Sequence, residues 1–192
     1  MCIHILYMNF KEFLEWITKH NGFLHESIIR KKVNGIFGMY ATQNIPKNTV
    51  LTKLPYKTCI ISRHITKKIN NTTTKTNDQQ GLIIFLIREY LKGEKSFYYP
   101  YLKNLPTYED YVSYSPLLYN EKMFSLLQKY NSNIFKTLSS QKKKLLHDAQ
   151  SIQKFDSSLK YNDIVRFLLI IKRRAWGYPK KNLPEHFLKN NK

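Results

Sequence analysis

The sequence predicts an α+β fold in which short antiparallel strands come first and helices follow. Four short runs rich in β-branched and aromatic residues, separated by turn residues, lie within residues 27–62. Stretches with apolar residues at helical spacing occupy most of the remainder. Strands grouped ahead of helices are typical of the α+β class. The chain has 192 residues, of which 42% are hydrophobic, so we expect one core in a single domain, with or without an insertion.

The N-terminal region begins with a predicted amphipathic helix. Apolar residues recur at helical spacing from an N-cap at Asn9 to Ile17, and Gly22 follows the last turn. Turn residues, beginning with Asn34-Gly35, separate the strands that come next. The predicted strands cover residues 27–33, 37–42, 49–54 and 58–62, with further turns at 46–48 and 55.

The rest of the chain is predicted to be mostly helical. Residues 70–80 are polar and of low complexity, which indicates an exposed loop. A buried helix over residues 82–91 follows and ends at Gly93. Three more helices are predicted at residues 120–130, 139–155 and 161–176.

The composition is strongly basic and limits the possible partners. Lys and Arg number 32 against 13 Asp and Glu, a formal charge of +19, so we expect non-specific attraction to polyanions. Part of this charge follows from a general richness in Lys, Asn, Ile and Tyr, and no nucleic-acid reader motif accompanies it. No membrane-spanning run and no signal peptide are recognised, so an intracellular location, cytoplasmic or nuclear, is expected.

Metal and nucleophile chemistry find no support in the sequence. Cys2 and Cys59 lack the paired spacing of a zinc site, and the six histidines show no metal-ligand spacing. No Ser-His-Asp set, phosphate-binding glycine loop or paired-carboxylate motif is present. We therefore predict no metal and name no catalytic residue.

Three segments, in their order along the chain, form a pattern that can be compared with known protein families. Residues 36–45, Ile-Phe-Gly-Met-Tyr-Ala-Thr-Gln-Asn-Ile, precede a strand-like run that ends in Pro at position 55. Residues 89–106 contain a Glu, a Gly, a Ser followed by aromatic residues, and a Leu-Pro pair. Residues 161–176 form a helix-like run that ends in Arg174 and an aromatic residue.

Together these segments resemble the SET-domain protein methyltransferases, in the branch that includes Rubisco large-subunit methyltransferase and the actin-histidine methyltransferase. The resemblance implies a SET-type fold of small antiparallel sheets with a helical insert. It implies residues 10–92 as the N-terminal part of the domain, 93–158 as the insert, and 159–192 as a return helix and truncated C-terminal part. It also implies transfer of a methyl group from S-adenosylmethionine to a protein side-chain nitrogen, with lysine as the expected acceptor.

The resemblance assigns five residues to the methyl donor. Gly38 and Tyr40 would lie beside S-adenosylmethionine, because a glycine lets the backbone approach a ligand closely. Glu89 and the backbone of Leu91 would hold its adenosine end, and Arg174 would lie near the donor and substrate channel. The sequence departs from the family pattern at Ile36, where the family has its first Gly, and at Tyr40, where it has a polar residue.

Residues 177–192 contain no Asn-His pair, and the family's catalytic tyrosine comes after that motif, so we expect the catalytic C-terminal segment to be absent from this chain. The same residues have simpler interpretations. Gly38 could mark a turn or bulge, and Glu89 could be a surface carboxylate paired with Arg88 or Lys92. Arg174 could belong to a solvated helix end. Two other functions stay open: a degenerate SET domain that acts as a protein-binding module, and a basic nucleic-acid-binding protein.

Overall fold

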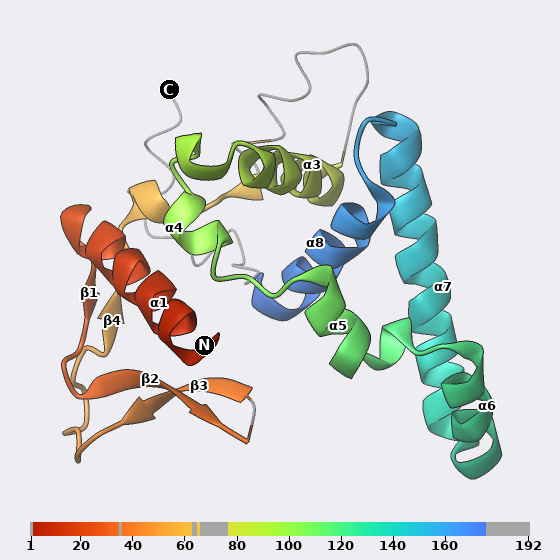
Figure 1. Ribbon diagram of the computed structural model, residues 1–192, viewed down its shortest axis with the longest axis horizontal. Helices are drawn as coiled ribbons and strands as arrows, with labels where there is room; N and C mark the ends of the chain where they lie inside the picture. Colours follow the sequence, from red (N-terminus) through yellow and green to blue (C-terminus); the bar gives the residue numbers. More distant parts are fainter. Residues whose placement is uncertain (1, 35, 63–64, 66–76, 176–192) are drawn as a thin grey trace. The chain divides into compact units, whose positions relative to one another are not determined.

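The computed structural model describes residues 2–34, 36–62, 65 and 77–175, and the side chains of residues 2–9 and 36 are not described (Figure 1). This part of the chain contains seven α-helices and two small antiparallel sheets of two strands each. The predicted combination of small sheets with helices is thus present, in a mostly helical chain. The chain divides into two compact units, Met1–Pro106 and Thr107–Lys192. The domain boundaries implied by the resemblance, after residues 92 and 158, stay predictions.

The first unit opens with α1 (Cys2–Lys19), which begins at Cys2 and not at the predicted N-cap Asn9. The residues before Asn9 contain no Gly or Pro, so nothing in the sequence stops the helix from extending over them. The predicted end is confirmed. Asn21 takes a left-handed conformation with φ of 66°, and the Gly22 N–H donates to the Ile17 carbonyl at 2.8 Å. This bond closes the helix with a Schellman motif.

Two pairs of short strands follow α1. β2 (Ile28–Val33) and β3 (Ile36–Ala41) form an antiparallel hairpin, in which Val33 pairs with Ile36. Asn34 at the turn has a φ of 50°, as the favoured two-residue hairpin connections require. β1 (Phe23–Leu24) pairs with β4 (Thr52–Lys53), so the strand predicted at residues 49–54 is reduced to its centre.

The strand predicted at residues 58–62 is wrong. Pro55 begins a turn of 3-10 helix, η1 (Tyr56–Thr58), and the Thr58 hydroxyl donates to the Pro55 carbonyl at 2.7 Å. Residues 59–61 have no regular secondary structure. The apolar run favours a strand locally, but these residues pair with no strand among the described residues.

The second half of the first unit is built on α3 (Asp78–Leu91), which buries its apolar residues Ile83, Ile84 and Ile87 completely. Its first turn corrects the loop prediction, because Asn77 and Gln80 form a capping box inside residues 70–80. The earlier part of that predicted loop lies outside the described residues. After α3 come η2 (Gly93–Lys95) and the short helix α4 (Tyr99–Leu102).

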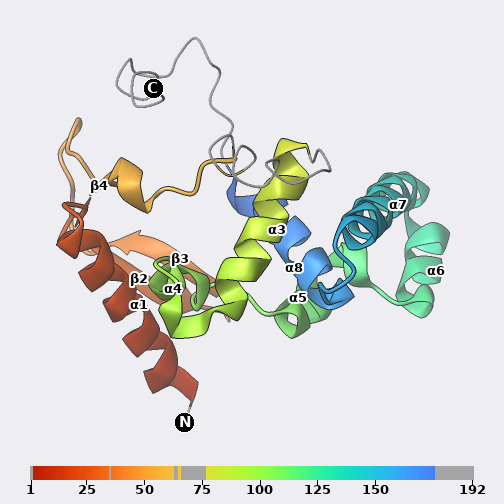
Figure 2. The same ribbon diagram turned by 90° about the horizontal axis from the view of Figure 1, so that it is seen from above.

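Helix α1 lies beside α4 (Figure 2). Lys103, just after α4, forms an ion pair with Glu12 of α1, and burial lowers the pKa of this lysine. The Trp16 ring of α1 contacts the Phe97 ring edge-on, with the ring centres 5.3 Å apart. These contacts fix α1 on the segment that follows α3.

The second unit is entirely helical in its described part. It contains α5 (Tyr108–Tyr114), η3 (Pro116–Leu118), α6 (Glu121–Tyr130), α7 (Ser132–Phe155) and α8 (Tyr161–Arg174). α6 runs beside α7, and α8 packs on α7 (Figures 1 and 2). Leu145 and Ala149 of α7 and Phe167 and Leu168 of α8 are fully buried and form the core.

The helices of this unit differ from the prediction in three places. α7 begins before residue 139, because the Asn131 side chain caps it by accepting from the Ile134 N–H at 3.1 Å. α5 was not predicted. α8 ends at Arg174, and the predicted end at residue 176 lies outside the described residues. No helix in the described part of the chain is long and apolar enough to cross a membrane.

Candidate functional site

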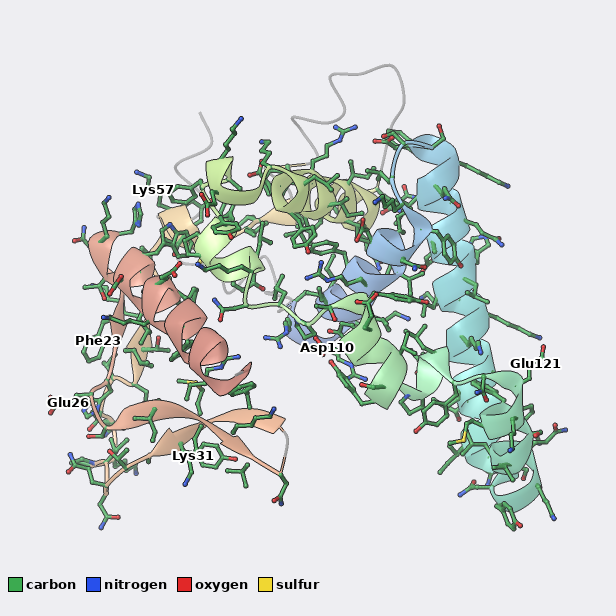
Figure 3. All side chains as sticks on the ribbon, in the orientation of Figure 1. Phe23, Glu26, Lys31, Lys57, Asp110 and Glu121 are labelled. Atoms are coloured by element: carbon green, nitrogen blue, oxygen red, sulfur yellow. The ribbon has the colours of Figure 1, made fainter. Side chains whose placement is uncertain are left out.

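Gly38 and Tyr40 lie together on one face of the β2–β3 hairpin. Gly38 pairs with Lys31 and Tyr40 pairs with Ile29, and alternation along the strands places all four on the same face. Figure 3 shows Lys31 pointing away from α1, so this face is turned away from the helix. Tyr40 is 40% exposed. The two residues predicted to meet the methyl donor therefore share an accessible surface.

The Tyr40 ring lies over Gly38. A Cβ added to Gly38 would come within 2.9 Å of the Tyr40 Cε2 atom. Gly38 takes part in a regular antiparallel ladder, so it is neither the turn nor a bulge that the simpler interpretation proposed. The space above this glycine is filled by a movable side chain from the same strand.

The opposite face of the hairpin holds it on the rest of the first unit. The Arg30 guanidinium lies over the Phe37 ring, 4.1 Å from its centre, and over the Phe10 ring of α1 at 5.2 Å. It also donates to the Asn104 Oδ1 atom at 3.4 Å. Cation–π contacts of this kind favour arginine because its planar group stacks on aromatic faces. Sequence reasoning gave no role to Arg30, which fixes the hairpin that carries Gly38 and Tyr40.

Glu89 is a buried carboxylate with two internal partners. It is only 8% exposed, which corrects the interpretation of Glu89 as a surface residue. Its Oε1 accepts from the Lys92 ammonium at 2.5 Å, as that interpretation expected of Lys92, and its Oε2 accepts from the Ser96 hydroxyl at 2.6 Å. The Ser96 oxygen in turn accepts the Tyr98 N–H at 3.1 Å. The carboxylate thus ties the end of α3 to the aromatic segment beyond it.

This turn uses the residues that define the second family-like segment. Gly93 takes a left-handed conformation with a φ of 55°, which lets the chain reverse after α3. The reversal brings Ser96 back to Glu89. Tyr98 then packs against Phe85 of α3, with ring centres 5.8 Å apart, so the predicted packing role of the aromatic residues is confirmed for Phe97 and Tyr98.

The surroundings of Glu89 change its acidity. Burial alone would raise the pKa of Glu89, but the hydrogen bonds from Lys92 and Ser96, together with the Lys92 charge, outweigh burial and lower the pKa. The nearby carboxylate also adds to the effect of burial in raising the pKa of Tyr98. Glu89 is therefore ionised at neutral pH and acts as a hydrogen-bond acceptor.

A lowered pKa links Glu89 to stability in acid. The contribution is present above the pKa of the carboxyl in the unfolded chain and is lost as the pH falls through the folded value. We expect Glu89→Gln to destabilise the protein at about pH 6 and to differ less from the wild type at about pH 3. Urea unfolding at the two pH values measures this, with Glu94→Gln at an exposed neighbouring position as the control. A destabilisation by Glu89→Gln that does not change with pH would contradict the lowered pKa of Glu89.

Leu91 and Arg174 are placed on the surface. Leu91 is the last residue of α3 and is 62% exposed. Arg174 is exposed at the end of α8, which agrees with a solvated helix end. Its neighbour Arg173 makes the aromatic contacts, with its guanidinium 5.6 Å from the Tyr111 ring centre and 5.5 Å from that of Tyr114. The tyrosine spacing in residues 111–114, at one helical turn, was the available signal for this cluster.

The structure brings the predicted residues together only in part. Gly38 and Tyr40 form one pair on the hairpin. Glu89 and Leu91 form a second pair only as neighbours along the end of α3, since Glu89 is buried and Leu91 is exposed. Among the described residues, no hydrogen bond, ion pair or ring contact joins the two pairs. Arg174 belongs to the second unit.

No three His, Cys, Asp or Glu side chains in the described ranges lie close enough to hold a metal ion. Comparison of the chain with protein-family models, with curated proteins and with solved structures found no match.

Proposed function

We propose that this chain supplies the donor-binding part of a SET-type protein methyltransferase. The reaction would transfer a methyl group from S-adenosylmethionine to a protein side-chain nitrogen, with lysine as the acceptor. One observation supports the proposal above the others. The Glu, Gly and Ser of the second family-like segment form one turn, in which Gly93 reverses the chain and Ser96 donates to Glu89. The pattern in the sequence thus corresponds to a structural motif.

The two residue pairs offer suitable groups for the donor. The atoms nearest to a Cβ added at Gly38 all belong to the Tyr40 side chain, so rotation of that ring would open the strand backbone to a ligand. Glu89 is ionised, and the side chain of its partner Lys92 is 55% exposed. A ribose hydroxyl could therefore replace Lys92 as a donor to the Glu89 carboxylate without leaving the ammonium buried.

For methyl transfer, the protein must align the acceptor amine with the methyl donor and remove water from around the amine. A deprotonated amine must lie in line with the donor's methyl–sulfur bond, and exclusion of water keeps the amine nucleophilic. In this scheme the amine proton is not removed by any of the five residues assigned to the donor, which are Gly38, Tyr40, Glu89, Leu91 and Arg174. We propose that a further segment, in the same chain or in a separate one, supplies the Asn-His motif and the tyrosine that orients the amine.

An assay of methyl transfer tests whether this chain and the further segment are both required. A segment with an Asn-His motif and a late tyrosine is supplied to the chain, either fused to it or as a separate protein. We expect tritium from labelled S-adenosylmethionine to enter protein only when the chain and that segment are both present. No incorporation in the presence of such a segment would favour the protein-binding module. Non-specific polyanion binding, from the charge of +19, stays a prediction beside this function.

A further inference from the structure

Helix α6 exposes a stripe of three apolar side chains. Met123, Leu126 and Tyr130 are 41%, 43% and 75% exposed. They follow one another at i, i+3 and i+7, so they lie on the same face of the helix. A different face packs on α7, where Phe124 contacts Phe135 with ring centres 6.1 Å apart. The stripe is therefore not needed to hold α6 in its own unit.

Lysines accompany the stripe without carboxylate partners. Lys122 and Lys129 lie within one helical turn of Leu126, along one edge of the stripe. The Lys129 ammonium lies 5.2 Å from the centre of the Tyr130 ring. Neither lysine forms an ion pair with any described residue, and the same holds for three exposed lysines of α7. Those three are Lys136, Lys143 and Lys144.

An apolar stripe with an unneutralised basic edge is complementary to an acidic amphipathic helix. Spacing at i, i+3 and i+7 is the anchor pattern of helix recognition between proteins. A polyanion would use the lysines and leave the apolar side chains in water. A membrane surface is the poorer fit, because a helix of 10 residues with three apolar side chains offers little area to insert.

We propose that α6 docks an acidic helix of a partner protein. Apolar side chains of that helix would cover Met123, Leu126 and Tyr130, and its carboxylates would pair with Lys122 and Lys129. Pairing across such an edge sets the orientation and the rate of association more than the final affinity. This docking site is independent of the methyl-transfer proposal, since it uses neither the hairpin nor the end of α3.

The probe for this site is a labelled synthetic helix of four heptads, with Leu along one face and Glu along both edges. Its binding to the full chain is followed by fluorescence anisotropy. We expect Leu126→Glu to weaken binding by at least about tenfold, because it places a like charge in the apolar contact. Gln128→Glu makes the same charge change on the opposite side of α6, and we expect less than about twofold weakening. Circular dichroism of both variants checks that the helix content of the chain is unchanged.

Three results would overturn the proposal. The first is no binding of the probe to the folded wild-type chain at about 0.1 mM. The second is equal weakening by Leu126→Glu and Gln128→Glu, which would reduce the site to general charge attraction. The third is anionic phosphatidylserine vesicles that bind the chain more tightly than the probe and lose binding with Leu126→Glu, which would identify a membrane contact instead.

Discussion

Replacing Gly22 by valine is expected to destabilise the first unit by about 2–4 kcal/mol. A Cβ at this position would lie 2.2 Å from the Ile17 Cγ2 atom and 2.8 Å from the Ile17 carbonyl oxygen. It would also lie 3.0 Å from the Pro55 Cδ atom. Ile17 is 5% exposed and its carbonyl is bonded in the helix cap, so the backbone itself must shift.

Urea unfolding followed by tryptophan fluorescence measures this effect, since Trp16 lies one turn before the cap. Gly93→Ala is the matched control. Gly93 has a φ of 55° but nothing within 4 Å of an added Cβ. Its substitution therefore lowers the free energy of unfolding only through backbone strain, by about 1 kcal/mol. A Gly22→Val variant no less stable than Gly93→Ala would show that the junction of α1, β1 and Pro55 is loosely packed.

The parts of the fold that were predictable depend on local signals. The β2–β3 hairpin follows from alternating residues around Asn34, which tolerates the positive φ that the turn needs. The end of α1 is signalled by Gly22, whose N–H bonds to the Ile17 carbonyl, while the preceding Asn21 takes the positive φ. A local signal is also present for α5, which the prediction lacks: Thr107 and Asp110 form a capping box, a pattern that is readable in the sequence.

The errors in the strands come from elements that need distant partners. Residues 58–62 have strand-forming composition, but strand formation needs a neighbouring strand, and the 3-10 turn at Tyr56 gives the chain a local alternative. β4 is short for a related reason, because its partner β1 offers only two residues. Sequence patterns carry no direct information on the length of a partner.

The candidate site was predictable by residue type but not by environment. The family-like pattern selected Glu89, yet its burial depends on the chain turning back so that Ser96 reaches it. The role of Arg30 depends on two rings, Phe10 and Phe37, that meet only after α1 packs on the hairpin. Such contacts between distant segments follow from tertiary packing.

The second large effect concerns Gly38. Gly38→Val would add a branched side chain where the Tyr40 ring now lies, and only that ring needs to move, so we expect little change in stability. The same side chain would block a ligand from the strand backbone, so donor binding should be lost. Glu89→Ala should weaken donor binding less, by roughly 1.5–3 kcal/mol for one charge-assisted hydrogen bond.

Saturation-transfer NMR of S-adenosylhomocysteine with the folded chain tests the donor site most directly, because it detects weak binding at about 1 mM ligand. The proposal predicts transfer to the adenine protons in the wild type, competition by S-adenosylmethionine, and loss of the signal in Gly38→Val at an unchanged thermal midpoint. No transfer to the folded wild-type chain, or a full signal in Gly38→Val, would contradict the assignment of this chain to methyl-donor binding.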